Sequence, residues 1–191
     1  AFGKSFLISL LRVLVGTPVN MLLTILVAYP LSRSHKEFRL RDFFAWFFLI
    51  TVLFSGGLIP WYMVIRQTGL IDKFWALIIP GALPVFNVIL LANSFRSIPK
   101  ELEEAAAMDG AGHWTILFKV LIPLSLPVLA TVTLFVAVAH WNAWFDGIIF
   151  MNSPAKYPLQ SYLKTVILQK DPKLLTASDA KLLRMVSDRT T

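Results

Sequence analysis

The stretch Ile98–Pro123, IPKELEEAAAMDGAGHWTILFKVLIP, is the one long polar, patterned segment between segments apolar enough to cross a bilayer. Pro99 suits a first helical turn, because its missing N–H costs nothing there. The glutamates and alanines that follow add negative charge at the helix start and strong helix propensity. Gly110 is expected to end the helix, because glycine adopts the left-handed conformation without steric cost. The stretch predicts a short polar helix outside the lipid, a turn, and a return of the chain into the membrane.

The composition places this chain among membrane proteins. Of its 191 residues, 57% are hydrophobic and 15% are charged, and the mean hydropathy is +0.68, which is too apolar for a soluble domain of this length. Cysteine is absent, so neither a disulfide framework nor a thiolate metal site is available. The formal net charge is +7, but the basic residues are divided among loops. We therefore interpret them as a topology signal and expect no nucleic-acid partner.

The apolar segments predict an all-α, polytopic membrane helical bundle that forms a single transmembrane domain over residues 1–191. Four spans are expected, at about residues 6–31, 43–65, 74–95 and 120–147. The loop Ser32–Asp42 is rich in arginine and lysine, which favours the cytoplasmic side. Two further crossings then place the loop over residues 96–119 on the cytoplasmic side as well, and a third crossing places residues 151–191 outside.

Three local features of the spans and the outer segment give structural expectations. Arg12 interrupts the first span, and we favour snorkelling to the interface or packing over a direct role in transport. Pro60, beyond Gly56 and Gly57 in the second span, is expected to kink a helix. A short helix is expected over Ser161–Gln169 in the outer segment.

A polar and aromatic cluster, His140–Gly147, follows the fourth apolar run. It allows two interpretations that the residues alone leave open. Tryptophan collects at membrane interfaces, which favours an aromatic belt. Indole rings also stack on apolar sugar faces while polar neighbours bind hydroxyl groups, so Trp141, Asn142, Trp144 and Asp146 are candidate solute contacts. Trp141 and Trp144 are three positions apart and are expected on one helical face.

Several chemical functions have no support in the sequence. It holds no G-x-x-x-x-G-K-[ST] phosphate loop, so ATP binding of the usual kind is not expected. The three histidines, His35, His113 and His140, are scattered, and none pairs with an acidic residue at metal-ligand spacing. We expect no metal, no cofactor, no catalytic residue and no enzymatic activity.

Glu104-Ala105-Ala106, Gly110 and the later Val120, Ile122 and Pro123 resemble the EAA loop of bacterial ABC-importer permeases. The pattern differs only by Val for Ile at 120 and Ile for Leu at 122, both volume-similar exchanges. The resemblance implies that this loop is a coupling helix seated in a cleft of an ATPase subunit. It makes Glu104 the polar anchor, Ala105 and Ala106 the close-packed face and Gly110 the turn. The implied ATPase-coupling residues are Glu104, Ala105, Ala106, Asp109, Gly110 and Pro123.

The order of the spans and the segments WNAWFDGIIF (141–150) and YPLQSYL (157–163) are similar to permeases of the carbohydrate type. This resemblance implies the second to fifth of six core spans, so the chain is expected to be a fragment. It also implies a transmembrane subunit of an ATP-driven importer in the bacterial inner membrane, with a carbohydrate solute, particularly an oligosaccharide. The implied partners are a pair of ATP-binding subunits, a second and non-identical permease subunit, and an extracytoplasmic solute-binding protein.

Two functions of other classes remain open. An exporter or channel component could use the same loop for a different cytoplasmic partner, and it would not depend on an external binding protein. A membrane-anchored scaffold would bind proteins through its polar loops, and no assembly that contains it would move solute. The polar loop on one side and the aromatic cluster on the other favour a transporter over a scaffold.

Overall fold

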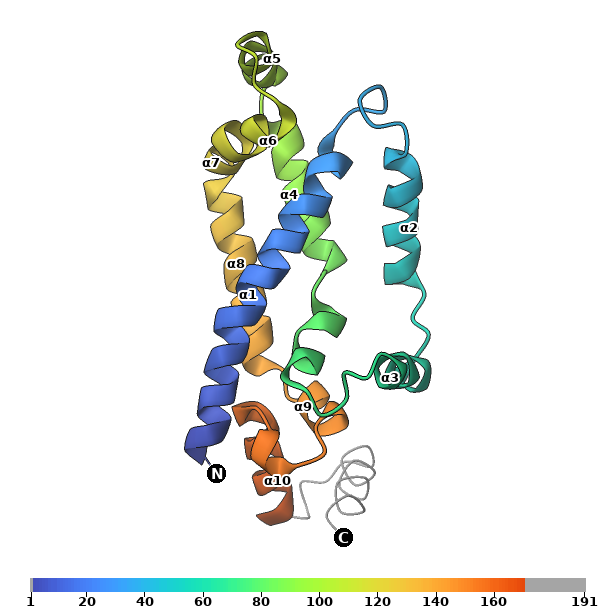
Figure 1. Ribbon diagram of the computed structural model, residues 1–191, viewed down its shortest axis with the longest axis vertical. Helices are drawn as coiled ribbons and strands as arrows, with labels where there is room; N and C mark the ends of the chain where they lie inside the picture. The colour runs from blue at the N-terminus through green and yellow to red at the C-terminus, as the bar shows by residue number, and fades with distance from the viewer. Residues whose placement is uncertain (1, 171–191) are drawn as a thin grey trace. The chain divides into compact units, whose positions relative to one another are not determined.

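The computed structural model describes residues 2–170, and every regular element in that range is helical, which confirms the expected all-α fold (Figure 1). The chain divides into two compact units. The first unit contains the segments up to Thr17, from Gly56 to Gly81 and from Ala137 onward. The second contains the segments Pro18–Ser55 and Ala82–Val136. Residues 171–191 of the predicted outer segment lie outside the described residues.

The elements before the polar stretch are α1 (Phe2–Ser32), α2 (Arg41–Leu53), α3 (Leu58–Gln67), the 3₁₀ turns η1 (Phe74–Leu77) and η2 (Ile79–Gly81), and α4 (Val85–Ser97). The polar stretch itself holds α5 (Lys100–Met108), α6 (His113–Ile116), the π-helical turn η3 (Leu117–Leu121) and α7 (Ile122–Leu124). The elements after it are α8 (Leu126–Asn142), α9 (Phe145–Phe150), the 3₁₀ turn η4 (Pro154–Lys156) and α10 (Leu159–Lys170). The helix expected over Ser161–Gln169 is confirmed as part of α10.

One helix of the described residues, α1, is by itself long and apolar enough to cross a membrane. Up to four spans result if each of three bent helix pairs counts as one crossing. The four expected spans therefore stay a prediction. Where the fourth was expected to start at about residue 120, the chain is bent by 83° between the helical segments His113–Leu124 and Leu126–Asn142, and the long apolar helix starts only at Leu126.

The expected kink at Pro60 is wrong. The chain leaves helical conformation between Leu53 and Leu58, and Gly57 there has φ +83°. Glycine reaches that region without the steric cost that a Cβ would add. Pro60 lies in the first turn of α3, where the missing proline N–H breaks no helical hydrogen bond. The break in the helix therefore lies before the proline, and Gly57 supplies the left-handed backbone from which α3 starts.

The second unit is held together by apolar side chains from α1, α4, α6, η3 and α8. Its buried residues are Ala28, Leu31, Val88, Leu91, Ala92, Phe95, Ile116, Leu117, Leu121 and Leu129. Burial of one large apolar side chain contributes about 1.5 to 3 kcal/mol. Ala106 of α5 packs against this cluster, which therefore supports the polar helix.

The first unit has a separate apolar cluster around Phe150, which is fully buried. The Trp61 ring meets the Phe150 ring edge-on at 4.9 Å between centroids. The backbone N–H of Leu159 donates to Ser9 Oγ at 2.7 Å, which connects the start of α10 to α1. These contacts fix the segments that surround the predicted tryptophan cluster.

Asp72 connects two segments of the first unit. Its backbone N–H donates to the carbonyl oxygen of Phe150 at 2.8 Å, and its Oδ1 accepts from the backbone N–H of Asn152 at 3.1 Å. Its other carboxylate oxygen pairs with Lys156 Nζ. The hydrogen bond from Lys156, followed by that from Asn152, holds the pKa of Asp72 below its ordinary value.

We expect Asp72→Asn to raise hydrogen exchange at residues 150–157 at neutral pH. The free energy of local opening should fall by only about 0.5 to 1 kcal/mol, because the ion pair is partly exposed. The folded pKa of Asp72 is lowered, so its contribution is complete above the unfolded pKa of about 3.9 and is lost as the pH falls through the folded value. The difference between variant and parent should therefore shrink in acid. Asp109→Asn, at an exposed carboxylate, is the control. An unchanged difference in acid would refute this account.

Candidate functional site

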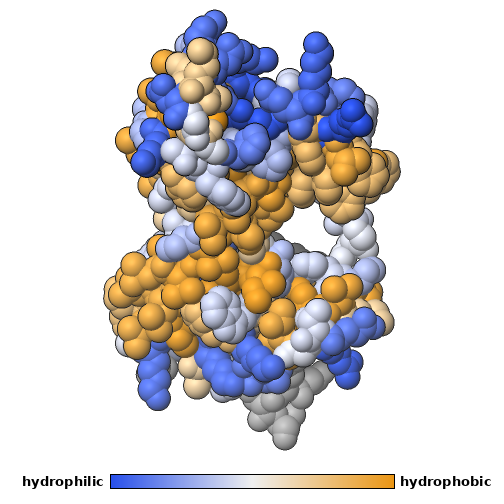
Figure 2. Space-filling view, turned by 45° about the horizontal axis from the view of Figure 1, so that its top comes forward, coloured by the Kyte–Doolittle hydropathy of each residue, from blue (hydrophilic) through white to orange (hydrophobic). Residues whose placement is uncertain are grey.

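The helix α5 is exposed to solvent along most of its surface. None of its residues is buried, and Met108 at its end is 90% exposed. Figure 2 shows hydrophilic side chains gathered at the end of the second unit that carries α5 and the loop over residues 33–40. A polar helix without a buried stripe does not form part of a core. It is suited to a partner outside this chain.

Gly110 ends α5 in the conformation expected from the sequence, with φ +81°. The backbone N–H of Gly110 donates to the carbonyl of Ala107 at 3.0 Å, and that of Ala111 donates to the carbonyl of Ala106 at 3.0 Å. These two bonds form the Schellman arrangement, which satisfies carbonyls that a helix end otherwise leaves open. The predicted helix stop is confirmed, and it gives α5 a defined end.

The structure separates the residues of the EAA pattern. Glu104 and Ala105 are exposed, whereas Ala106 is half-buried and packs against the apolar cluster of the second unit. Ala105 and Ala106 thus face different surroundings, because consecutive residues lie about 100° apart around a helix. Asp109 is exposed just after α5, and Pro123 is exposed in α7. Of the two alanines, Ala105 is the one that a partner could reach.

In the first unit, Arg12 and Asp146 form an ion pair that is buried at Arg12 and partly buried at Asp146. Arg12 is 3% exposed, and its guanidinium donates to both carboxylate oxygens, with Nη1 to Oδ1 at 3.1 Å. Further contacts of Arg12 are Nε to His140 Nδ1 at 3.4 Å and Nη1 to the carbonyl of Ala143 at 3.4 Å. Two-pronged pairing of this kind is among the stronger charged hydrogen bonds. The pair fixes the turn between α8 and α9 to the first half of α1.

Arg12 therefore does not snorkel, and it is a packed, paired residue instead. Of the two expected alternatives, snorkelling and packing, the structure shows packing, against a partner, Asp146, that is 134 positions away in the sequence. The same pairing occupies Asp146, which was predicted as a solute contact. His140 is also buried rather than free to bind hydroxyl groups, and it lies directly against Gly16. A Cβ at Gly16 would stand 2.6 Å from His140 Nε2, so only glycine fits there.

A cavity of about 440 Å³ lies beside this ion pair within the first unit. Arg12, Trp61, Asn142, Trp144 and Asp146 are among its lining residues. We call it the tryptophan cavity. Its size falls in the range of small-molecule sites, as does its mixture of aromatic walls and a few polar groups.

Trp144 and Trp141 are not on one helical face, so that expectation is wrong. The helix α8 ends at Asn142 and α9 starts at Phe145, which leaves Trp144 in the turn between them. Trp141 packs edge-on against Phe6 at 6.0 Å and does not line the tryptophan cavity. The Trp144 carbonyl accepts from Ser161 Oγ at 2.6 Å, and Lys164 Nζ lies 5.1 Å from the Trp144 ring centre.

Sequence reasoning missed Arg12 and Trp61 as members of this site, since both come from segments far from the tryptophan cluster. The available signal for Arg12 was its charge inside an apolar run, because a buried charge in a membrane protein pairs with another polar group. Among residues 2–170, no three His, Asp or Glu side chains are placed to share a metal ion.

The chain belongs to the family of binding-protein-dependent transport system inner membrane components, whose family model matches residues 2–182. It is 43% identical over 165 residues, 86% of this chain and 57% of the relative, to the polygalacturonan/rhamnogalacturonan transport system permease protein YtcP of Bacillus subtilis (strain 168). It is 39% identical over 183 residues, 96% of this chain and 60% of the relative, to the protein LplC of the same organism.

A solved structure of a bacterial ABC transporter involved in the import of the acidic polysaccharide alginate shares the fold. The TM-score is 0.85 and the identity 35%, and the match covers 96% of this chain and 64% of that chain. The present chain thus spans about 60% of the length of these curated relatives. The resemblance to importer permeases is confirmed at the level of the family.

We expect Asp146→Asn to destabilise the protein by about 3 to 5 kcal/mol, because it leaves the buried Arg12 charge without its partner. Arg12→Gln should cost less, because the Asp146 carboxylate that it leaves is partly exposed. The double variant should regain much of that loss, since it removes both charges. Thermal unfolding in lipid nanodiscs, with the two single variants and the double variant side by side, measures the coupling between the sites. A double variant no more stable than either single variant would contradict the ion-pair account.

Proposed function

We propose that this chain is part of the transmembrane subunit of an ATP-driven importer and that α5 couples it to a separate ATPase. One observation carries the proposal: α5 is exposed and ends in a glycine cap at Gly110, at the EAA spacing, in a chain of this family. Glu104 then serves as the polar anchor in the ATPase cleft. Ala105 is the small residue that permits close approach, and Gly110 sets the angle of the helix.

The assembly follows from the same proposal. Two ATP-binding subunits lie on the cytoplasmic side, a second and non-identical permease subunit completes the path, and a solute-binding protein delivers the solute from outside. The chain crosses the bacterial inner membrane several times, with residues 96–119 inside and the turn that holds Trp144 outside. The description of the family, an inner membrane component of binding-protein-dependent transport systems, supports the inner membrane and the external binding protein.

The energetic requirement explains why α5 must be firmly held. Alternating access needs a shift between two conformations, and moving such an equilibrium from 1:99 to 99:1 takes about 5.5 kcal/mol. ATP binding can drive that shift only if the movement of α5 is passed to the spans. The Schellman cap and the packing of Ala106 on the core both restrict its movement relative to the second unit.

The proposed solute is a carbohydrate, specifically an oligosaccharide. Two relatives are named for polygalacturonan or rhamnogalacturonan and for alginate, all of which are polysaccharides. The tryptophan cavity offers an indole for an apolar sugar face and the Asn142 amide for hydroxyl groups. The charge of Arg12 is balanced by Asp146 in the same cavity wall. Any preference for an acidic sugar therefore needs further positive groups beyond this pair.

The docking of α5 is tested by cysteine cross-linking of the full-length parent in membranes. A thiol at Met108, with its partner thiol in the cleft of the candidate ATPase, should form a cross-link whose yield changes with ATP. The matched control is a thiol at Ala106, on the same helix but turned toward the core of its own chain, which should not react. If neither thiol, or both equally, reacted with the ATPase, the coupling assignment would fail.

The solute site is tested by replacing each of the two tryptophans with alanine in separate variants. Trp144→Ala should lower oligosaccharide uptake about fivefold, the effect of losing one aromatic contact worth roughly 1 kcal/mol. Trp141→Ala, which alters a ring outside the cavity, should leave uptake per inserted protein nearly unchanged. The measurement is uptake into proteoliposomes from a panel of acidic and neutral oligosaccharides. Equal losses for both variants would remove the tryptophan cavity as the solute site.

A further inference from the structure

Arg33, the residue that follows α1, forms an ion pair with a glutamate of the coupling helix α5. Arg33 Nη1 pairs with Glu103 Oε2, 70 positions further along the chain. Both side chains are largely buried, with 14% and 15% of their surface exposed. An exposed ion pair contributes little, because water and salt screen it. This pair is shielded, so it restricts α5 more strongly than a surface contact of the same kind.

Arg33 also packs over the ring of Tyr29, whose hydroxyl is hydrogen-bonded to α6. Its guanidinium carbon lies 4.5 Å from the centre of the Tyr29 ring, a cation–π arrangement. The Tyr29 hydroxyl donates to the carbonyl oxygen of His113 at 3.2 Å and lies 3.3 Å from His113 Nδ1. The end of α1 is thus bonded to α5 before the Gly110 turn and to α6 after it.

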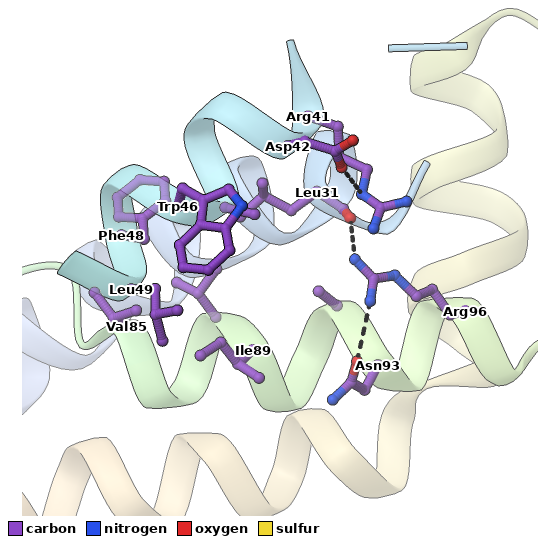
Figure 3. Close-up of a pocket in the computed structure, with 13 residues that line it drawn as sticks. Leu31, Arg41, Asp42, Trp46, Phe48, Leu49, Val85, Ile89, Asn93 and Arg96 are labelled. Atoms are coloured by element: carbon purple, nitrogen blue, oxygen red, sulfur yellow. Dashed lines mark hydrogen bonds and ion pairs between the residues drawn. The ribbon is translucent and has the colours of Figure 1, made fainter. Parts of the chain in front are cut away.

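A third contact comes from the end of α4, the helix that leads into α5. Arg96 Nη2 donates to the carbonyl oxygen of Leu31 at 2.5 Å (Figure 3). The last carbonyls of a helix lack partners within it and carry partial negative charge, so a guanidinium there is favourable. Three elements around the coupling segment, α4, α5 and α6, therefore meet the chain between Tyr29 and Arg33.

Consecutive glutamates on α5 have different surroundings. Glu103 is turned toward Arg33, whereas Glu104 is exposed. The other charged residues around Glu103 line a cavity of about 330 Å³, and they are Glu37, Arg41, Arg96, Lys100 and Glu104. Within the described residues, the Arg33 guanidinium is the group that reaches Glu103 in an ion pair. One glutamate thus binds inside the chain and leaves its neighbour for a partner.

We propose that Arg33 is a positioning residue for coupling: through Glu103 it fixes the angle of α5, so that movement of the coupling helix reaches α1 directly. The inference rests on the proposed function of α5. Arg33 does not need to touch the ATPase. Without the pair, α5 keeps its cap and its exposed face but can pivot about its two ends, and ATP is then consumed without a matching movement of the spans.

The test uses the full-length parent with its ATPase and binding protein in proteoliposomes. The variants are Arg33→Gln, Glu103→Gln and the exchanged pair Arg33→Glu with Glu103→Arg, and Arg39→Gln, an exposed arginine of the same loop, is the control. The readout is ATP hydrolysed per oligosaccharide transported, for a panel sugar that the parent takes up. Each single variant should raise this ratio about tenfold. The exchanged pair should bring the ratio most of the way back to the parent value, and the control variant should have the same ratio as the parent.

A second readout does not depend on the solute. Spin labels at Met108 and at Leu22, an exposed residue of α1, should give a broader distance distribution in the single variants than in the parent or the control. An unchanged ratio and distribution in Arg33→Gln would overturn the inference, as would an exchanged pair that behaves like the single variants. If the Met108 thiol fails to cross-link to the ATPase in the parent itself, the proposed function fails instead.

Discussion

The left-handed backbone at Gly110 is the constraint on which the polar segment around α5 depends. In a bilayer, backbone groups must be bonded within the protein, so a chain that turns back does so outside the lipid or against protein. The Schellman bonds at Gly110 satisfy the end of α5 over only a few residues. The chain can therefore present a polar helix and resume an apolar one at Leu126 without a long unsupported loop. The direction of α5 follows from this cap together with the contacts of Arg33.

The Arg12–Asp146 pair is the corresponding constraint in the first unit. Moving an arginine and an aspartate away from water costs several kcal/mol for each ion, which only good geometry and further bonds offset. Here the guanidinium meets the carboxylate with two prongs and also reaches His140 and the Ala143 carbonyl. The arrangement fixes the turn that carries Trp144. A cavity wall is therefore defined by a polar contact inside an apolar helix, and not by packing alone.

Local chemistry explains which features the sequence could predict. Gly110, the acidic start of α5 and the helix around Ser161 depend on neighbours within a few positions, so their patterns are visible in one dimension. The break before Pro60 was misplaced, because a proline in a first helical turn disturbs nothing while Gly57 supplies the unusual backbone. For Arg12 the sequence left snorkelling and packing open. It could not choose between them, because the partner Asp146 is distant in the chain and no local pattern indicates a pairing of that kind.

The same distinction separates a motif from its geometry. The EAA spacing identifies a segment, but it treats Ala105 and Ala106 as one face and says nothing of Glu103. The helical rotation of about 100° per residue places them differently: Ala106 packs on the core, Glu103 meets Arg33, and Glu104 with Ala105 faces outward. A helix that binds a partner must also be held by its own chain, and neighbouring residues can serve these two needs because the helix turns them in different directions. The residues that hold the helix need not belong to the motif that identifies it.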